Sequence, residues 1–589
     1  TGPPPLEVHE VMMGTVAAWR PPDAGLPVRA DGEPDAGRVV QAMCAAMTRL
    51  GTPAPRRPWL DELAETYDLA DLASRSHSPA GVVCGLVDNP SRQAQHVATY
   101  EPDHDGNLVV LGGSGAGKST ALRTIAVAAT LVSGTVPAHI YGLDAASGGL
   151  EMLRPLPHVA DVIGADDLDR VGRLMKRLAD LVRERSARFT AARASSLPDY
   201  CGTAGVLPLP RVVLLIDGYG AFQAEYMNSV GSQPAFADFQ EVLAHGRSVG
   251  VHVVMSADRV GALHTSVQAL VSRTIVLRLN DENHYGMLGL RKTGLNSQSP
   301  AGRGVDVATR LEMQVGVWGG IARINEQAKA IEALAATASV LPSQRARPIP
   351  RMPVRVGGST MPAHVDGLPV LGIDGTSLQP RGFSVDRAIM IAGQAGTGRT
   401  GALAWMATAI SRASPRRRIV HLTQRRTSIG DLRAWSASFQ GSSAGEEFLA
   451  TWGAELARPA DGDDQIVLCI ENVQDFGAAI SDGPLVQAIR QARRQGHLVI
   501  GEADIQGWAN GQLVSELKGA RRGLLLAPEG ADAQMLFSAA APRQPRADMP
   551  PGRGVWIDSG RVATVQVPLV DDELSPDSEG TPISPRQSR

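Results

Sequence analysis

The residues from Gly112 to Thr120, GGSGAGKST, have the types and the spacing of a loop that binds phosphate. They fit the pattern G-x-x-x-x-G-K-[ST], and they lie between an apolar segment, 107–111, that predicts a strand and an alanine-rich segment, 118–129, that predicts a helix. In that setting the N–H groups of the loop and the helix dipole converge on one point, which favours a phosphate group. We expect Lys118 to bridge the β- and γ-phosphates of ATP and the Ser119 hydroxyl to ligate the Mg²⁺ that accompanies ATP. The expected phosphate-binding residues of this first P-loop are Gly112, Gly113, Ser114, Gly115, Ala116, Gly117, Lys118, Ser119 and Thr120.

A second requirement of this chemistry is a carboxylate at the end of a neighbouring strand, and an apolar segment ends in Asp217. We expect Asp217 to hold the metal ion through water, together with Ser119. Many ATPases with this loop place a glutamate next, where it polarises the attacking water, but Gly218 follows here. Asp144 ends another predicted strand, and it either faces the γ-phosphate or caps a buried turn. The sequence therefore predicts ATP binding with slow hydrolysis, with Asp217 and Asp144 as candidate catalytic acids.

A second P-loop, GQAGTGRT at residues 393–400, departs from the pattern at the residues that carry charge. Arg399 replaces the lysine, and its planar guanidinium contacts phosphate but is not interchangeable with a compact ammonium inside a tight loop. Glu471 replaces the metal-binding aspartate, and Asn472 occupies the position of the base. We expect a fold retained for structure or for partner binding, and its nucleotide binding stays open. The residues that would contact a nucleotide here are Gly393, Gly398, Arg399 and Thr400.

The repetition extends through most of the chain and indicates a duplication. Each P-loop is preceded by a short strand with a Gly-Leu or Gly-Ile pattern and followed by an apolar strand that ends in an acid. Further on, an arginine precedes a third apolar strand and is followed, at an identical spacing, by an aspartate. These pairs are Arg247 with Asp258 and Arg493 with Asp504. A motif P-x-G-R-G, at 300–304 and again at 550–554, then leads into a final pair of strands.

This alternation of strand and helix patterns predicts an α/β fold with two tandem P-loop NTPase domains. Each is expected to be a mostly parallel sheet with helices on both faces and with the nucleotide at the carboxyl ends of the strands. The expected organisation is a linker or docking segment over 1–75, with an amphipathic helix at 39–50, a domain with the intact P-loop over 76–340, a proline-rich and basic linker over 341–365, a degenerate domain over 366–570, and a disordered tail over 571–589.

Composition limits the class of protein. The 589 residues are 43% hydrophobic, which is typical of a globular protein with several cores, and no uninterrupted apolar segment is long enough to span a membrane. A net charge of −3 gives no general attraction to nucleic acid or anionic lipid. The four cysteines have no metal-ligand or redox spacing, so we expect buried free thiols in a reducing compartment. The first residue is Thr, which favours a processed protein or a piece of a longer one.

Two basic features each have a functional and a structural interpretation. Arg247 lies just before a buried strand, where ring motors can project an arginine into the ATP site of the neighbouring subunit, so it is a candidate catalytic residue. Its recurrence as Arg493 makes that role about as plausible as a surface ion pair. The predicted helix over 167–194 has one apolar face and many arginines elsewhere. We interpret those arginines as a solvated face rather than a DNA-binding stripe, because the chain is not basic overall.

In their order along the chain these motifs resemble the FtsK/SpoIIIE class of hexameric ATPases. The segments that carry the resemblance are GGSGAGKST, LLIDGYG, HGRSVGVHVVMSADR and PAGRG. The segment LDAASGGLEMLRPLPHVADVIGADD and the pair Asp217-Gly218 further resemble the second ATPase domain of EccC-type proteins, the motor ATPases of type VII (ESX) secretion. The degenerate copy resembles their third ATPase domain, and the resemblance covers residues from about 35 to 568.

The resemblance implies a membrane-anchored motor with three tandem ATPase domains, of which only the first needs full hydrolytic competence. It implies that ATP at the first P-loop is structural or regulatory, and that the later domains receive WXG100-type substrates through a C-terminal signal. It further implies a cytoplasmic location at the inner face of the cell membrane, a hexameric ring, and association with membrane-bound secretion components or with the first ATPase domain. The alternative function is an FtsK/SpoIIIE-type DNA translocase, but the acidic tail lacks a DNA-reading winged helix, so DNA is not an expected partner.

Overall fold

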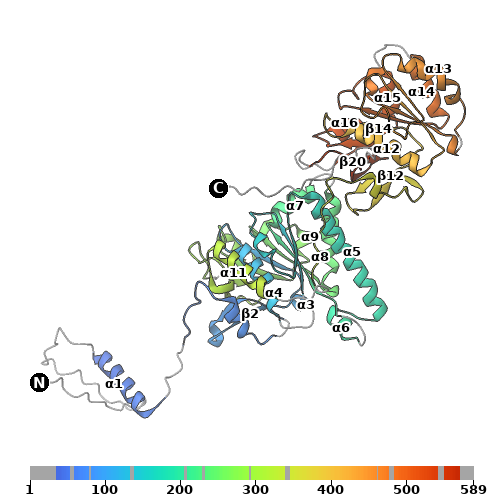
Figure 1. The fold of residues 1–589 in the computed structure, drawn as a ribbon. Helices are drawn as coiled ribbons and strands as arrows, with labels where there is room; N and C mark the ends of the chain where they lie inside the picture. Colours follow the sequence, from blue (N-terminus) through green and yellow to red (C-terminus); the bar gives the residue numbers. More distant parts are fainter. Residues whose placement is uncertain are drawn as a thin grey trace, which may run out of the picture. The chain divides into compact units, whose positions relative to one another are not determined.

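The computed structural model of this chain describes residues 35–52, 59–78, 81–132, 138–203, 208–228, 232–290, 294–338, 345–460, 462–476, 483–541 and 549–570. The chain divides into two compact units, residues 1–62 with 89–95, and residues 63–88 with 96–589. In the first unit the structure has the helix α1 (Asp35–Leu50), where the amphipathic pattern predicts one. The second unit contains two large sheets with their helices (Figure 1). The predicted tail lies outside the described residues.

The first sheet has ten strands in the order β2-β1-β10-β9-β8-β3-β7-β6-β4-β5. The strands from β8 to β5 pair in parallel, whereas β9 pairs antiparallel with β8, β10 with β9, and β1 with β10. The strands are β1 (Val82–Asn89), β2 (Ala94–Tyr100), β3 (Leu108–Leu111), β4 (His139–Asp144), β5 (Val159–Gly164), β6 (Val212–Asp217), β7 (Val251–Ala257), β8 (Arg273–Leu277), β9 (Arg303–Asp306) and β10 (Glu312–Val315). The helices of this first domain are α2 (Leu69–Ser74), α3 (Pro102–Asp105), α4 (Lys118–Leu131), α5 (Leu168–Ala192), α6 (Leu197–Gly202), α7 (Tyr219–Asn228), α8 (Gln233–His245), α9 (Thr265–Gln268), α10 (Asn283–Met287) and α11 (Ile324–Thr337).

The second sheet repeats this order as β11-β12-β21-β20-β19-β14-β18-β17-β15-β16, with β13 added against β12. Its strands are β11 (His364–Val365), β12 (Leu368–Asp374), β13 (Pro380–Gly382), β14 (Ile389–Ala392), β15 (Arg418–Thr423), β16 (Ala437–Gln440), β17 (Ile466–Ile470), β18 (Leu498–Ala503), β19 (Arg522–Leu526), β20 (Arg553–Asp558) and β21 (Arg561–Gln566). The helices of this second domain are α12 (Arg399–Ala413), α13 (Ala444–Leu456), α14 (Pro484–Arg494), α15 (Gln512–Lys518) and α16 (Asp532–Phe537). The matching order confirms the predicted fold of two tandem α/β domains.

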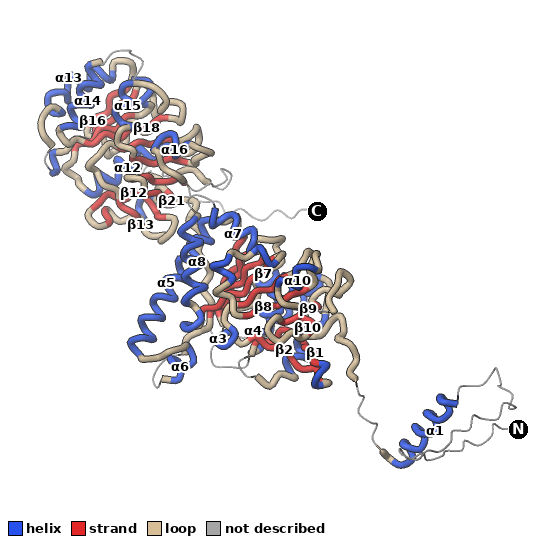
Figure 2. The backbone as a smooth tube through the Cα atoms, turned by 180° about the vertical axis from the view of Figure 1, so that it is seen from behind, coloured by secondary structure: helices blue, strands red, loops and turns tan. Residues whose placement is uncertain are grey.

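The central strands are apolar along their whole length because both faces of each sheet are covered. In β3, Val109 and Leu111 pack into one buried cluster with α5, α7 and α8, whereas Leu108 and Val110 pack into another with α4. Figure 2 shows the first sheet between these helices. Side chains alternate across a strand, so a continuous apolar run predicts exactly such a two-sided burial. The second sheet is built the same way, with α12 on one face and α13, α14 and α15 on the other.

The four cysteines fit their prediction only in part. They are free, and Cys84 and Cys469 are buried in strands. Burial raises the pKa of the Cys84 thiol to about 11, and it raises that of Cys469 as well. Cys44 is exposed and Cys201 is half-buried, so the expectation of buried thiols is wrong for Cys44.

The motif P-x-G-R-G connects each P-loop to the chain that enters its domain. Gly302 N donates to Ala116 O (2.8 Å), and Gly552 N donates to Thr397 O (2.9 Å). The next residue, Arg303, donates to Leu63 O (2.6 Å) and to Gln314 Oε1 (2.9 Å). Arg553 repeats this arrangement with Pro353 O and Gln566 Oε1, at 2.8 and 3.1 Å. The motif therefore stabilises each P-loop and holds the segment that precedes each domain.

We expect Arg303→Met to destabilise the first domain, because Gln314 and the Leu63 carbonyl would lose a charged donor whose side chain is 11% exposed. A decrease of about 2 kcal/mol in the free energy of unfolding corresponds to a fall of about 5 °C in the melting temperature of a domain of this size. Differential scanning calorimetry measures this change. The control is Arg323→Met, since the Arg323 side chain is 80% exposed and pairs with Glu326 on the same helical turn. Equal shifts for the two variants would contradict the role of Arg303.

Candidate nucleotide site

The first P-loop joins β3 to α4 at the carboxyl edge of the parallel strands. Gly112 N donates to Ala257 O at the end of β7 (3.1 Å), and Gly113 N donates to Arg278 O after β8 (2.8 Å). These bonds tie the loop to both strands that flank β3. Gly117 is the N-cap of α4 and has φ 100°, so the loop turns sharply into the helix with its N–H groups directed at one region.

Two glycines of this loop lie in close contacts, Gly117 against backbone and Gly113 against the movable side chain of Asn280. A Cβ on Gly117 would lie 2.7 Å from Gly302 N, and the positive φ disfavours any other residue there. A Cβ on Gly113 would lie 2.1 Å from Asn280 Oδ1. Asn280 was not expected near the loop, because the sequence gives no signal that the residues after β8 return to it.

The partner of Lys118 is one that a phosphate could displace. Its Nζ donates to Gly112 O (2.9 Å) and Gly113 O (2.8 Å), and it lies 2.9 Å from Asp258 Oδ1. The Asp258 side chain is 82% exposed, so this ion pair contributes only about 0–1 kcal/mol. A nucleotide phosphate in the loop would offer Lys118 a better-placed negative charge at little cost.

The residues expected to hold the metal ion meet at one point. Asp217 is 1% exposed, its Oδ1 accepts a hydrogen bond from Ser256 Oγ (2.6 Å), and its Oδ2 has no hydrogen-bond partner among the described residues. A Cβ built on Gly149 would lie 3.2 Å from Ser119 Cβ and 3.4 Å from Asp217 Oδ2, so both side chains border the same small space. A buried carboxylate oxygen without a partner beside a serine fits a Mg²⁺ ion bound with its waters.

The structure favours the capping interpretation of Asp144. Its Oδ1 accepts hydrogen bonds from Ala146 N and Gly148 N (both 3.1 Å), and its Oδ2 accepts one from Leu150 N (2.9 Å). Three backbone donors leave this carboxylate poorly placed to take a proton from water. It instead shapes the turn that brings Gly149 against the metal region.

Arg123 is a site residue that the sequence analysis missed. It is 5% exposed, and its Nη1 donates to Gly149 O (3.0 Å) and its Nη2 to Thr120 Oγ1 (2.9 Å). Burial lowers the pKa of Arg123, and the nearby charges of Asp217 and Asp144 oppose this change. An arginine within the alanine-rich helix after the P-loop is the signal that could have identified it.

Gly218 occupies the position where a glutamate base is usual, and its backbone does not suit one. Its φ is 85°, its N–H donates to Ser256 Oγ (2.8 Å), and a Cβ there would lie 3.0 Å from Ala145 O. Side chains rarely adopt that φ, and this Cβ would press on backbone rather than on a movable side chain. A glutamate at this position would therefore be strained, although its counterpart Asn472 carries a side chain at φ 52°.

The basic residues outside the P-loop have internal partners. Arg247 Nη2 donates to His104 O (2.6 Å) and its Nε to Asp103 O (3.3 Å), at the amino end of β7 and so at the edge of the sheet opposite the P-loop. Its role towards a neighbouring subunit stays a prediction. In α5, Arg170 pairs with Asp161 and Arg185 donates to Val249 O (2.9 Å), which favours a structural role for these two arginines.

At the second P-loop the predicted residues lie close together, but Arg399 and Thr400 already contact carboxylates of their own domain. Arg399 Nη1 lies 2.9 Å from Glu502 Oε1, and Thr400 Oγ1 donates to Glu471 Oε1 (3.3 Å). Gly398 has φ 96°, and a Cβ there would lie 2.9 Å from Gly552 N, as at the first P-loop. The loop geometry is thus retained, whereas the side chains at its charged positions already have partners.

Comparison with known proteins agrees with this geometry. Residues 74–293 match the model of the FtsK/SpoIIIE family. The chain is 29% identical over 256 residues to the ESX-1 secretion system protein EccCb1 of Mycolicibacterium smegmatis, a match that covers 42% of each protein. It is 32% identical over 286 residues to the ESX-4 secretion system protein EccC4 of Mycobacterium tuberculosis, covering 47% of this chain and 22% of that protein. The matches span less than half the length of these relatives.

Solved structures share the tandem fold. ATPases 2 and 3 of Thermomonospora curvata EccC, in complex with a signal sequence peptide, superpose with a TM-score of 0.73 at 21% identity, over 87% of this chain and all of that one. ATPases 2 and 3 of EssC from Geobacillus thermodenitrificans give a TM-score of 0.56 at 19% identity, over 88% of this chain and all of that one. The resemblance inferred from the motifs is confirmed.

We expect Gly218→Glu to leave ATP turnover no faster and to destabilise the first domain. A glutamate at φ 85° against the Ala145 carbonyl costs about 1–3 kcal/mol of backbone strain. Steady-state phosphate release and thermal unfolding measure the two effects. The control is Gly220→Glu, because Gly220 has open space around its Cβ position and lies exposed in α7. A tenfold gain in turnover for Gly218→Glu would show that the backbone does accept a working base.

Proposed function

We propose that this chain, in which residues 74–293 form a domain of the FtsK/SpoIIIE family, is an ATP-binding coupling subunit of a type VII protein secretion system. It holds Mg²⁺-ATP at the first P-loop, hydrolyses it slowly, and takes part in recruiting secreted substrates. The observation that carries ATP binding is the partnerless buried Oδ2 of Asp217 beside Ser119, at the end of an intact P-loop.

In this proposal each residue of the first site has a defined task. The N–H groups of Gly113 to Gly117 and the start of α4 surround the phosphates, and Lys118 exchanges its exposed partner Asp258 for phosphate charge. Ser119 and Asp217 hold Mg²⁺, which neutralises phosphate charge when bound. Arg123 donates hydrogen bonds to Thr120 and Gly149 and so fixes the residues beside the metal site.

Slow hydrolysis follows from the two positions that could activate water. Gly218 carries no side chain, and the carboxylate of Asp144 already accepts three backbone hydrogen bonds. General-base assistance is worth about 10²–10⁴-fold in rate, so its loss favours long residence of ATP over turnover. ATP then acts as a structural or regulatory ligand.

The secretion role rests on the relatives. The EccC and EccCb1 proteins are named as components of ESX secretion systems, and a Thermomonospora curvata EccC with the same tandem fold was solved with a signal sequence peptide. We therefore propose a WXG100-type substrate, recognised through its C-terminal signal, and membrane-bound secretion components or a further ATPase domain as partners. We further propose that the chain acts at the inner face of the cell membrane as part of a hexameric ring.

We expect the purified chain to carry one ATP, and Lys118→Ala to abolish tight binding at the first P-loop. Removal of the ammonium leaves the β- and γ-phosphates without their cation. Acid release followed by chromatography gives the nucleotide per chain, and calorimetric titration gives the affinity. Lys329→Ala is the matched control, because Lys329 lies exposed on α11. Unchanged binding in Lys118→Ala would contradict the proposal.

We expect a WXG100-type dimer to bind the chain in a manner that depends on the C-terminal tail of the dimer, and DNA to have no effect on ATP turnover. The arginines of α5 that pair with Asp161 and with the Val249 carbonyl are not available to a phosphate backbone. Titration with the dimer, with the tail-truncated dimer and with duplex DNA measures all three. Strong stimulation of turnover by DNA would favour an FtsK/SpoIIIE-type translocase instead.

A further inference from the structure

We propose that the second P-loop is closed to nucleotide by an internal ion pair, in which the buried carboxylate of Glu502 takes the place of the ATP phosphates opposite Arg399. The second domain thus keeps the shape of a nucleotide site and supplies its own anion. This inference goes beyond ATP binding at the first P-loop and concerns residues outside that site.

The register of the sheets identifies Glu502 as the counterpart of Ser256. In the first sheet the third residue of β3, Val110, pairs with Ser256 on β7. In the second sheet the third residue of β14, Ile391, pairs with Glu502 on β18. Glu502 also accepts a hydrogen bond from Asn472 N (3.1 Å), as Ser256 does from Gly218 N. A short neutral hydroxyl in one copy is therefore a long carboxylate in the other.

The longer side chain changes what the P-loop cation meets. In the first copy Lys118 pairs with Asp258, which is 82% exposed and easily displaced. In the second copy Arg399 pairs with Glu502, whose side chain is 2% exposed. Burial raises the pKa of Glu502, and the charge of Arg399 opposes that rise. Release of Arg399 for a phosphate would therefore leave a buried carboxyl group without its cation, which costs more than release of an exposed acid. Asp504, the counterpart of Asp258, instead accepts a hydrogen bond from Gly507 N (2.5 Å).

The metal half of the second site is satisfied only in part by internal contacts. Glu471 Oε1 accepts hydrogen bonds from Thr400 Oγ1 (3.3 Å) and Thr427 Oγ1 (3.1 Å). Its Oε2 lies 3.5 Å from Nε2 of the buried His421 but, like Asp217 Oδ2, has no hydrogen-bond partner among the described residues. Burial raises the pKa of Glu471, but the contacts with His421, Thr427 and Thr400 outweigh it and hold that pKa below its usual range. The Thr400 hydroxyl donates its proton and keeps its oxygen lone pairs, so the block to nucleotide lies at Arg399 and Glu502 rather than in this half of the site.

Charge completes the argument. The position of Arg123 on α4 is taken by Ala404 on α12, so the cation that lies near Asp217 in the first copy has no counterpart there. Glu471 and Glu502 are both buried, at 5% and 1% exposed. A triphosphate in this loop would face two buried carboxylates and an arginine that is already neutralised, so binding is disfavoured by repulsion as well as by lost contacts.

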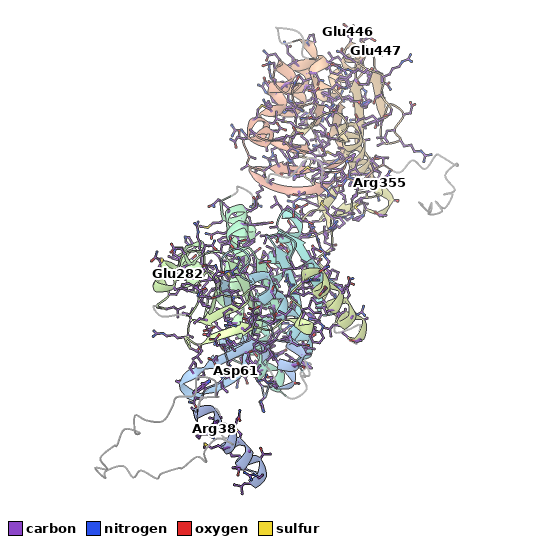
Figure 3. The ribbon with its side chains drawn as sticks, turned by 90° about the vertical axis from the view of Figure 1, so that its left-hand side faces the viewer. Arg38, Asp61, Glu282, Arg355, Glu446 and Glu447 are labelled. Atoms are coloured by element: carbon purple, nitrogen blue, oxygen red, sulfur yellow. The ribbon has the colours of Figure 1, made fainter. Side chains whose placement is uncertain are left out.

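Restoration of the first-copy residues tests this proposal in the full chain. In a Lys118→Ala background, which silences the first P-loop, we expect a fluorescent ATP analogue with Mg²⁺ to bind at least 100-fold more weakly than to the unmodified chain. Addition of Arg399→Lys and Glu502→Ser should then tighten binding at least tenfold. The control is Arg399→Lys with Glu446→Gln, since the side chain of Glu446 lies at the surface of α13 (Figure 3) and should give no gain.

Two results would overturn the proposal. One is tight binding that persists in the Lys118→Ala background and is removed by Arg399→Ala. The other is a folded Arg399→Lys/Glu502→Ser variant that gains no affinity. The affinities of the unmodified chain and of Lys118→Ala are compared first, and this comparison tests the first site alone. Failure of the first site is therefore distinguished from failure of this inference.

If the Arg399→Lys/Glu502→Ser variant does not fold, a second measurement without nucleotide still tests the proposal. If the ion pair replaces ATP, Arg399→Ala and Glu502→Gln each lower the melting temperature of the second domain in ATP-free buffer, by several degrees more than Glu446→Gln. Unchanged melting in both variants would mean that Arg399 and Glu502 do not hold the site closed, which contradicts the proposal.

Discussion

The hydrogen bond from Gly302 N to Ala116 O is the contact on which the first site depends. It is short because Gly117 has no side chain, and a Cβ there would lie 2.7 Å from Gly302 N. A segment near the end of the domain, just before β9, therefore holds the P-loop, which lies near its beginning, after β3. The same bond joins Gly552 to Thr397, where Gly398 is equally restricted. Because this brace involves only backbone and glycine, the loop shape survives changes in the charged residues around it.

That independence explains how two copies with one backbone carry different chemistry. In the first copy Lys118 is paired to an exposed aspartate, and one oxygen of Asp217 has no hydrogen-bond partner among the described residues. In the second copy Glu502 reaches Arg399 and completes the arrangement from within. Under the two proposals, one copy is suited to ATP, and the other pairs its P-loop cation with its own buried carboxylate.

The same reasoning applies to the slow turnover proposed for the first P-loop. Binding requires the loop, Lys118, Ser119 and Asp217, and all four are held in place by contacts that do not involve a base. Water activation requires one more carboxylate, and a side chain on Gly218 at φ 85° would be strained against the Ala145 carbonyl. Binding and turnover are therefore separable in this fold, because they depend on different backbone positions.

The sequence by itself determined the two α/β domains, their origin by duplication, and the residues of both P-loops. Local patterns were sufficient there, because apolar runs, glycine spacing and the lysine before α4 act over a few residues. Only the tertiary structure decided that Asp144 caps a turn, that Arg123 lies behind the metal region, and that Arg399 faces Glu502. Arg399 and Glu502 are far apart in the chain, and they meet because β14 and β18 pair in one register. Such a contact depends on burial and on which strands are neighbours, and neither is encoded in the residues on either side of the two partners.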